Sequence, residues 1–238
     1  MTPQGQSPHD AVIFDLDGTL VDTLPDIQYA LNRLLGEAGF AALSLSDVTG
    51  MIGGGVASLV NRAIDAVGAP SEPANRARWT ARFHALYSAE PVRLSRPYPG
   101  AQAVLSELAQ SGHRLAVCTN KPQDIATAIL RHLDLLSPFD AVFGDDGVRP
   151  RKPDPTIIRE AMTRLGSDAG STIVVGDGAA DFGAARGAGA SIVLVTYGYG
   201  SGLQGLGADL LIDELRALPQ ALGRLRSHRS ADRGTRPV

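Results

Sequence analysis

Short apolar runs that stop at a small or polar residue recur along this chain, and they limit its possible folds more than any other feature. The five runs are Ala11–Leu16, Leu115–Cys118, Ala141–Phe143, Thr172–Val175 and Ser191–Val195. Runs without polar alternation are typical of strands buried on both faces, as in a parallel sheet. Apolar residues at helical spacing lie between the later runs, for example within 101–108 and 158–165. The pattern predicts an α/β fold with a doubly wound parallel sheet, whose ligands bind at the carboxyl ends of the strands.

The alternation of strand and helix patterns fails over residues 25–96, where only helical patterns occur. About seventy residues is far more than a normal connection between two strands requires. We therefore expect a helical cap domain at 25–96, inserted into a discontinuous, Rossmann-like core formed by residues 10–24 and 97–222. Residues 1–9 and 223–238 are expected to be disordered tails.

Composition limits the classes of protein to which the chain can belong. It has 238 residues, a net charge of −3 and no apolar run longer than four residues, which predicts a globular protein without a membrane span. The start of the chain lacks the pattern of a secretory signal, and the single cysteine, Cys118, excludes an internal disulfide. We expect a cytoplasmic monomer or homodimer that binds neither nucleic acid nor a membrane.

Four aspartates follow two of the predicted strands. Asp15 and Asp17 lie two residues apart at the end of the first run, and Asp177 and Asp181 follow the run that ends at Val175. Carboxylates gathered at one sheet edge would repel one another unless a cation or a proton intervened. A turn rich in Asp and Gly explains either pair equally well when it is taken alone.

Two further segments place a hydroxyl and a cation at the same edge. Thr119 and Asn120 follow the second run, where a helix start suits an anion but equally suits an ordinary N-cap. Lys152 lies between an arginine and a proline after the third run. Lys121 and Lys152 are the only lysines among 22 basic residues, and Lys and Arg are not interchangeable at a phosphate. Acids, a hydroxyl and a lysine together match a Mg²⁺-dependent phosphoryl site.

These motifs, in this order, resemble those of the haloacid dehalogenase superfamily of phosphatases. The resemblance runs from about residue 11 to residue 222. It rests on three sequence motifs, Phe14–Asp22 (FDLDGTLVD), Thr119–Pro122 (TNKP) and Lys152–Pro155 (KPDP). The residues of these motifs are most similar to those of the phosphoglycolate phosphatases in the superfamily. The position of the insert is also similar, which implies a cap over the active site.

The resemblance implies a role for each motif residue. Asp15 would be the nucleophile that forms an aspartyl-phosphate, and Asp17 would be the general acid and base. Mg²⁺ would be held by Asp15, Asp177 and the backbone carbonyl of Asp17. Thr119, Asn120 and Lys152 would bind the phosphoryl group, and Asp181 would support Lys152. Gly178 departs from the family pattern, which often has Ser or Thr at this position.

The expected reaction is the hydrolysis of 2-phosphoglycolate, a small phosphorylated metabolite, to glycolate and phosphate. The carboxylate of 2-phosphoglycolate requires a second anion site in addition to the phosphate site. We expect Gly54, at the start of a helical pattern, and Arg62, on the polar side of that helix, to form it. Three alternatives stay open. They are a phosphatase of another ester such as a sugar phosphate, a phosphomutase similar to β-phosphoglucomutase, and a non-catalytic binding module.

The segment Gly200–Gly205 also fits the dinucleotide-binding fingerprint G-x-G-x-x-G. An amphipathic helix does not follow it, so a βαβ unit is missing. We interpret it as a flexible glycine-rich loop.

Overall fold

The core of the protein is a parallel sheet in the order β5-β4-β1-β6-β7-β8. The structure is a computed structural model that describes residues 11–233. The strands are β1 (Ala11–Phe14), β4 (Arg114–Pro122), β5 (Ala141–Asp145), β6 (Thr172–Gly176), β7 (Ser191–Val195) and β8 (Leu210–Ile212). The five strands expected from the apolar runs are present, which confirms the α/β class with a doubly wound sheet. β8 adds a sixth strand at the edge, where its three residues gave only a weak signal.

The strand order reverses beside β1, which pairs with β4 on one side and β6 on the other. Open α/β sheets bind their ligands at such a reversal, beyond the carboxyl ends of the strands. In the register, Phe14 lies opposite Val117 of β4 and Val175 of β6. Asp15, which directly follows β1, and Asp177, which directly follows β6, therefore lie near each other at the carboxyl ends of two neighbouring strands.

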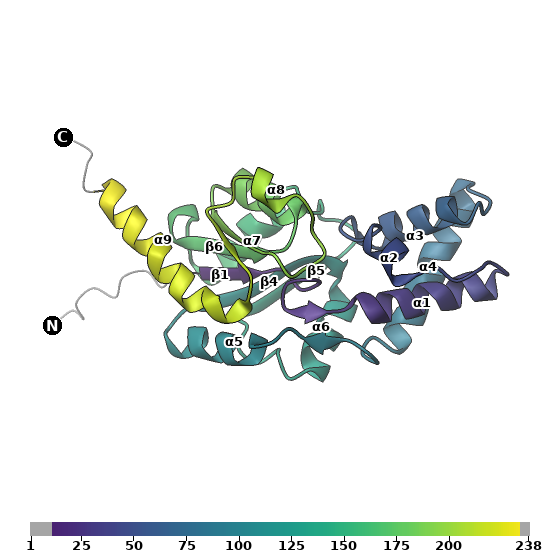
Figure 1. Cartoon of the computed structure of the whole chain (residues 1–238), viewed down its shortest axis with the longest axis horizontal. Helices are drawn as coiled ribbons and strands as arrows, with labels where there is room; N and C mark the ends of the chain where they lie inside the picture. The colour runs from purple at the N-terminus through teal and green to yellow at the C-terminus, as the bar shows by residue number, and fades with distance from the viewer. Residues whose placement is uncertain (1–10, 234–238) are drawn as a thin grey trace.

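Helices cover both faces of the sheet (Figure 1). α5 (Ala101–Gln110), α6 (Gln123–His132) and α9 (Leu218–Arg233) pack on one face, and α7 (Thr156–Leu165) and α8 (Ala179–Ala188) on the other. β1 supplies both cores, because Val12 and Phe14 point to the first face and Ala11 and Ile13 to the second. Successive strand side chains alternate between faces, so a strand covered on both sides must be apolar throughout. Short 3-10 turns occur at Ala169–Ser171, Leu203–Gly205 and Leu215–Ala217.

Four helices form a separate layer beyond the sheet edge, at the right of Figure 1. They are α1 (Leu24–Glu37), α2 (Leu45–Thr49), α3 (Gly55–Ala66) and α4 (Pro73–Ala89). Their interior is apolar and includes Trp79, whose ring lies against Phe40 with centroids 5.8 Å apart. We call this layer, residues 24–89, the four-helix insert.

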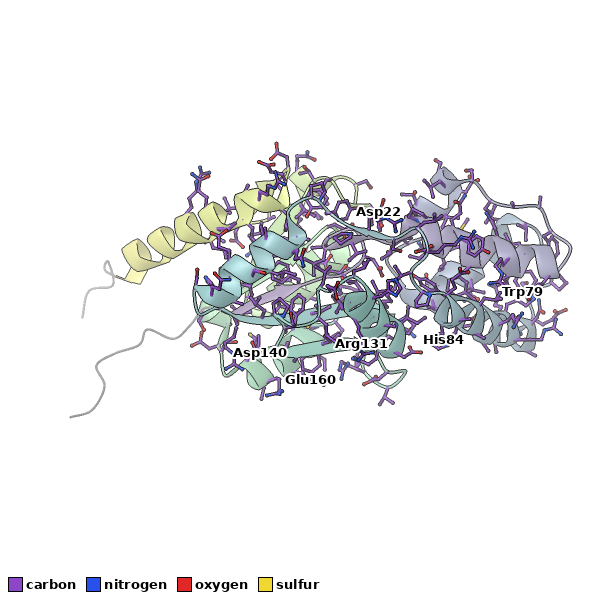
Figure 2. All side chains as sticks on the ribbon, turned by 90° about the horizontal axis from the view of Figure 1, so that it is seen from below. Asp22, Trp79, His84, Arg131, Asp140 and Glu160 are labelled. Carbon is purple, nitrogen blue, oxygen red and sulfur yellow. The ribbon has the colours of Figure 1, made fainter. Side chains whose placement is uncertain are left out.

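A short antiparallel ribbon joins the four-helix insert to the core. It consists of β2 (Val21–Asp22) and β3 (Arg96–Pro97). Figure 2 shows Asp22 at this junction, between the sheet and helix α4, which carries Trp79 and His84. The buried carboxylate of Asp26 in α1 accepts hydrogen bonds from three backbone amides of the returning segment 93–95, at distances down to 2.7 Å. This carboxylate therefore holds together the two chain segments that cross between insert and core.

Residues 223–233, expected to belong to a disordered tail, form the larger part of α9 instead. Leu222 and Leu225 are buried against the first core, so the helix continues past residue 222 because it still covers apolar surface. Residues 1–10 and 234–238, which include the rest of both expected tails, lie outside the described part of the chain. Over residues 11–233, helices of sufficient length and apolarity to cross a membrane are absent.

Candidate active site

Three buried carboxylates converge where the strand order reverses. Oxygen atoms of Asp15, Asp177 and Asp181 all lie within 4.8 Å of one another. Asp15 follows β1, Asp177 follows β6, and Asp181 lies one turn later in α8. Asp181 also accepts hydrogen bonds from the backbone amides of Asp177 and Gly178, at 3.3 and 3.2 Å. A carboxylate at the N-terminus of a helix is favourably placed.

Lys152 supplies the positive charge that this cluster requires. Its ammonium nitrogen lies 2.6 Å from Asp181 and 2.9 Å from Asp15, and it donates a further hydrogen bond to the carbonyl of Cys118. Its side chain is only 3% exposed. Burial disfavours the ammonium ion, but the attraction of Asp15 and Asp181 outweighs this and raises the pKa of Lys152 above its usual range. Lys152 is therefore a fixed cation beside Asp15.

The single positive charge of Lys152 does not neutralise three carboxylates, and the pKa values of two of them are raised as a result. Burial raises the pKa of Asp15 to about 6, despite the opposing effect of Lys152. Burial, together with repulsion from Asp181 and Asp15, raises the pKa of Asp177 to about 8. Oxygen ligands with excess negative charge suit a hard divalent cation such as Mg²⁺. The residues present therefore fit a divalent metal.

A glycine-rich loop after β7 packs tightly on Asp177. The backbone amide of Tyr199 donates a 2.7 Å hydrogen bond to its carboxylate. A β-carbon at Gly200 would overlap the carbonyl oxygen of Asp177. On the other side, Gly18 has a φ of +79°, and a β-carbon there would overlap the same carboxylate. Gly200 and Ser201, from the segment interpreted as a flexible loop, thus line the site, and glycine is required at positions 18 and 200 because no side chain fits.

Asp17 lies in a second polar group, on the side of the site that faces the four-helix insert. Its Oδ1 accepts hydrogen bonds from the Thr23 hydroxyl at 2.5 Å and from the Lys121 ammonium at 2.7 Å. The Lys121 nitrogen also lies over the ring of Tyr87 from α4, 4.7 Å from its centroid. Burial acts against the charge of Lys121, but the attraction of Asp17 outweighs it and raises the pKa of the lysine. The carboxylate of Asp17 is thereby held beside the insert.

Asn120 connects the two parts of the molecule through backbone contacts. Its amide nitrogen donates to the carbonyls of Lys152 and Gly53, at 3.0 and 3.2 Å, and its oxygen accepts from the Lys152 amide at 2.9 Å. In this arrangement the side chain orients Lys152 and holds the loop before α3. Thr119 is buried next to it, and its hydroxyl accepts a hydrogen bond from the Lys121 amide at 3.2 Å.

These residues line one cavity of about 410 Å³ between the sheet edge and the four-helix insert. Its floor includes Asp15, Asp17, Thr119, Asn120, Lys121, Lys152, Asp177 and Asp181. The insert supplies a largely apolar roof, with Ile27, Ile52, Val56, Leu59, Phe83 and Tyr87. A cavity of this size and lining accommodates a small charged metabolite.

The structure does not bring every predicted residue to the cavity. Gly53 and Gly55 line it, but Gly54 between them does not. Arg62 is absent from the lining, and its guanidinium lies 3.4 Å from the carbonyl of Gly50. Their proposed role in binding the substrate carboxylate stays a prediction without a contact that supports it.

Sequence reasoning missed a role for two residues of the site. Lys121 had a signal, because it is one of two lysines in the chain, yet its pairing with Asp17 spans 104 positions. The sequence gives no signal for a role of Tyr199, because the residues around it are typical of a loop. Its hydroxyl accepts hydrogen bonds from the amides of Thr23 and Leu24 and donates to Asp22.

Comparison with known proteins agrees with this geometry. The family described as haloacid dehalogenase-like hydrolase matches residues 12–195. The chain belongs to this family, as its motifs led us to expect.

Two relatives share most of their length with it. One is the plasmid phosphoglycolate phosphatase of Cupriavidus necator, 43% identical over 90% of this chain and 94% of that protein. Another is the phosphoglycolate phosphatase of Rhodospirillum rubrum, 42% identical over 90% of each chain. A crystal structure of a predicted phosphoglycolate phosphatase from Haemophilus somnus is also similar, with a TM-score of 0.85 and 28% identity over 92% of this chain and all of that one.

Proposed function

We propose that this protein is a Mg²⁺-dependent phosphomonoesterase that hydrolyses 2-phosphoglycolate to glycolate and phosphate. The observation that carries the proposal is the convergence of Asp15, Lys152, Asp177 and Asp181 on one buried point below a cavity. The likeness to two phosphoglycolate phosphatases supports the choice of substrate.

In the proposed reaction Asp15 attacks phosphorus while the bond from phosphorus to the ester oxygen breaks. Lys152 holds the attacking carboxylate in place, and its ammonium group offers a donor to a phosphoryl oxygen. A water molecule then attacks the phosphorus of the aspartyl-phosphate, which releases phosphate and regenerates Asp15.

Asp17 would move the protons in both steps. It donates one to the leaving alkoxide of glycolate and takes one from the attacking water. Thr23 and Lys121 hold its carboxylate on the insert side of the cavity, where the leaving group has to lie.

Asp15, Asp177 and the backbone carbonyl of Asp17 would hold the metal. When bound, Mg²⁺ would offset the repulsion between the carboxylates and the phosphate dianion. Every other part of the mechanism belongs to side chains of this chain.

A panel of phosphate esters tests the proposal. Purified protein is assayed for phosphate release from 2-phosphoglycolate, glucose 1-phosphate, glucose 6-phosphate and p-nitrophenyl phosphate, with and without Mg²⁺. We expect the highest kcat/KM with 2-phosphoglycolate and loss of activity on chelation. Interconversion of the two glucose phosphates would indicate a phosphomutase instead.

A further inference from the structure

Lys121 is the second cation of the cavity, and it lies beside the proposed proton donor Asp17 and not beside the proposed nucleophile. Lys121 and Lys152 are the two residues with positively charged side chains in its lining. Lys152 is occupied by Asp15 and Asp181. Lys121 forms an ion pair with Asp17, and its side chain is only 2% exposed. A buried ammonium group is costly, so its retention here calls for a role.

Over residues 11–233, the ammonium group of Lys121 has one carboxylate partner. An ammonium group has three donors, and Asp17 is the anion that contacts this one. Tyr87 covers the group with its ring face and does not contribute a negative charge, because burial raises the pKa of its hydroxyl to about 12. The roof beside Tyr87 is apolar, with Phe83 and Ile27. The same low-polarity surroundings would strengthen an ion pair with a ligand.

The covalent structure of the substrate brings its carboxylate to this place. In 2-phosphoglycolate the carboxylate carbon is two bonds from the ester oxygen that Asp17 would protonate. The Lys121 nitrogen lies 2.7 Å from Oδ1 of Asp17. A molecule whose ester oxygen contacts Asp17 therefore has its carboxylate within reach of Lys121.

We propose that Lys121 binds the carboxylate of the substrate and thereby selects a phosphorylated hydroxy acid over a neutral phosphate ester. This inference rests on the proposed function and adds the group that recognises the second anion. It assigns to the core a task that Gly54 and Arg62 of the insert were expected to perform. Tyr87, from the insert, closes over the same ammonium group, so the subsite is complete only when the insert and the core are together.

The test compares two substrates that differ only in the anion. 2-Hydroxyethyl phosphate has a hydroxymethyl group in place of the carboxylate and also has an aliphatic alkoxide as leaving group. A general defect in proton donation by Asp17 therefore slows both reactions alike. The enzyme with Mg²⁺ is assayed as wild type, Lys121→Gln, Lys121→Arg and Arg131→Gln. Arg131 is exposed on α6, outside the cavity lining, and controls for the loss of one positive charge (Figure 2).

We expect Lys121→Gln to lose at least about tenfold more kcat/KM with 2-phosphoglycolate than with 2-hydroxyethyl phosphate, since a hydrogen bond to a charged group is lost. Lys121→Arg should retain more of the preference, and Arg131→Gln all of it. Equal losses with both substrates would overturn the inference and leave Lys121 as a support for Asp17. A wild type that does not prefer 2-phosphoglycolate would instead overturn the proposed substrate.

If Lys121→Gln does not fold, Asp17→Asn and the double variant Asp17→Asn/Lys121→Gln replace it. The double variant removes both charges of the pair and avoids an unpaired buried carboxylate. Calorimetry then measures the binding of the two esters to each protein. The inference is supported if the double variant binds 2-phosphoglycolate at least about tenfold more weakly than Asp17→Asn does, while the two proteins bind 2-hydroxyethyl phosphate alike. It is overturned if the two proteins bind 2-phosphoglycolate with equal affinity.

Discussion

The hydroxyl of Tyr199 joins the loop above Asp177 to the start of the four-helix insert, and removing it should weaken that junction. The hydroxyl oxygen accepts hydrogen bonds from the amides of Thr23 and Leu24, at 2.8 and 3.0 Å, and donates to Asp22 at 2.7 Å. Thr23 and Leu24 are 0% and 7% exposed, so water does not readily replace the lost acceptor. The variant Tyr199→Phe keeps the ring and removes these hydrogen bonds.

The expected cost follows from two amides left without an acceptor. A buried polar group without a partner costs about 1–3 kcal/mol, and the partial exposure of Tyr199 favours the lower half of that range. For two amides we therefore expect a loss of about 2–4 kcal/mol in the free energy of unfolding. For a chain of this size, this corresponds to a fall in Tm of roughly 5–15 °C.

Thermal unfolding and amide hydrogen exchange together measure this effect. The matched control is Tyr197→Phe, which removes a single 2.8 Å hydrogen bond to the carbonyl of Thr19, leaves one buried group without a partner and should cost only about 1–2 kcal/mol. Exchange should accelerate at the amides of Thr23 and Leu24 in Tyr199→Phe alone. If the two variants unfold at the same temperature and the exchange of these amides is unchanged, the reasoning about the junction is refuted.

Three further outcomes follow from the site. Asp15→Asn should abolish phosphate release while the circular dichroism spectrum stays that of the wild type, and substantial hydrolysis would remove Asp15 from the role of nucleophile. Because the pKa values of Asp15 and Asp177 are raised to about 6 and 8, the metal-free protein binds more protons when folded than when unfolded. The stability of the metal-free protein should therefore fall as pH rises from about 4 to about 8, and Mg²⁺ should raise Tm more at pH 8 than at pH 5. A stability that does not change over this pH range would contradict the repulsion among the buried carboxylates. Gly200→Ala should weaken Mg²⁺ activation, because its β-carbon would overlap the carbonyl of Asp177, whereas Gly205→Ala, with open space around it, should not.

Much of this molecule was determined by local sequence. The five apolar runs predicted their strands because a strand covered on both faces has no polar position, and Ser191–Val195 has the predicted bounds. Asp15, Asp177 and Lys152 could be placed together because parallel strands end at one edge of the sheet. The helical patterns of residues 25–96 indicated the insert, since nothing in them fitted a strand.

Tertiary structure decided which charges meet across long separations. Lys121 could not be paired with Asp17 from sequence, because the contact depends on the relative height at which β1 and β4 end. Tyr87 reaches the same lysine only because the insert folds back over the sheet edge. The helix beyond residue 222 likewise depends on burial of Leu225 against the core, which outweighs the polar composition of that segment.

The glycine-rich loop after β7 shows the same division most clearly. Its composition predicts a loop without regular structure, whereas the structure has a short 3-10 turn at Leu203–Gly205 with Leu203 buried. Whether such a loop is free or packed depends on what lies opposite, which local sequence does not encode. Here it lies against Asp177, where Gly200 leaves no space for a side chain and the Tyr199 amide binds the carboxylate. Sequence therefore determined which residues could do chemistry, and packing decided which neighbours hold them in position.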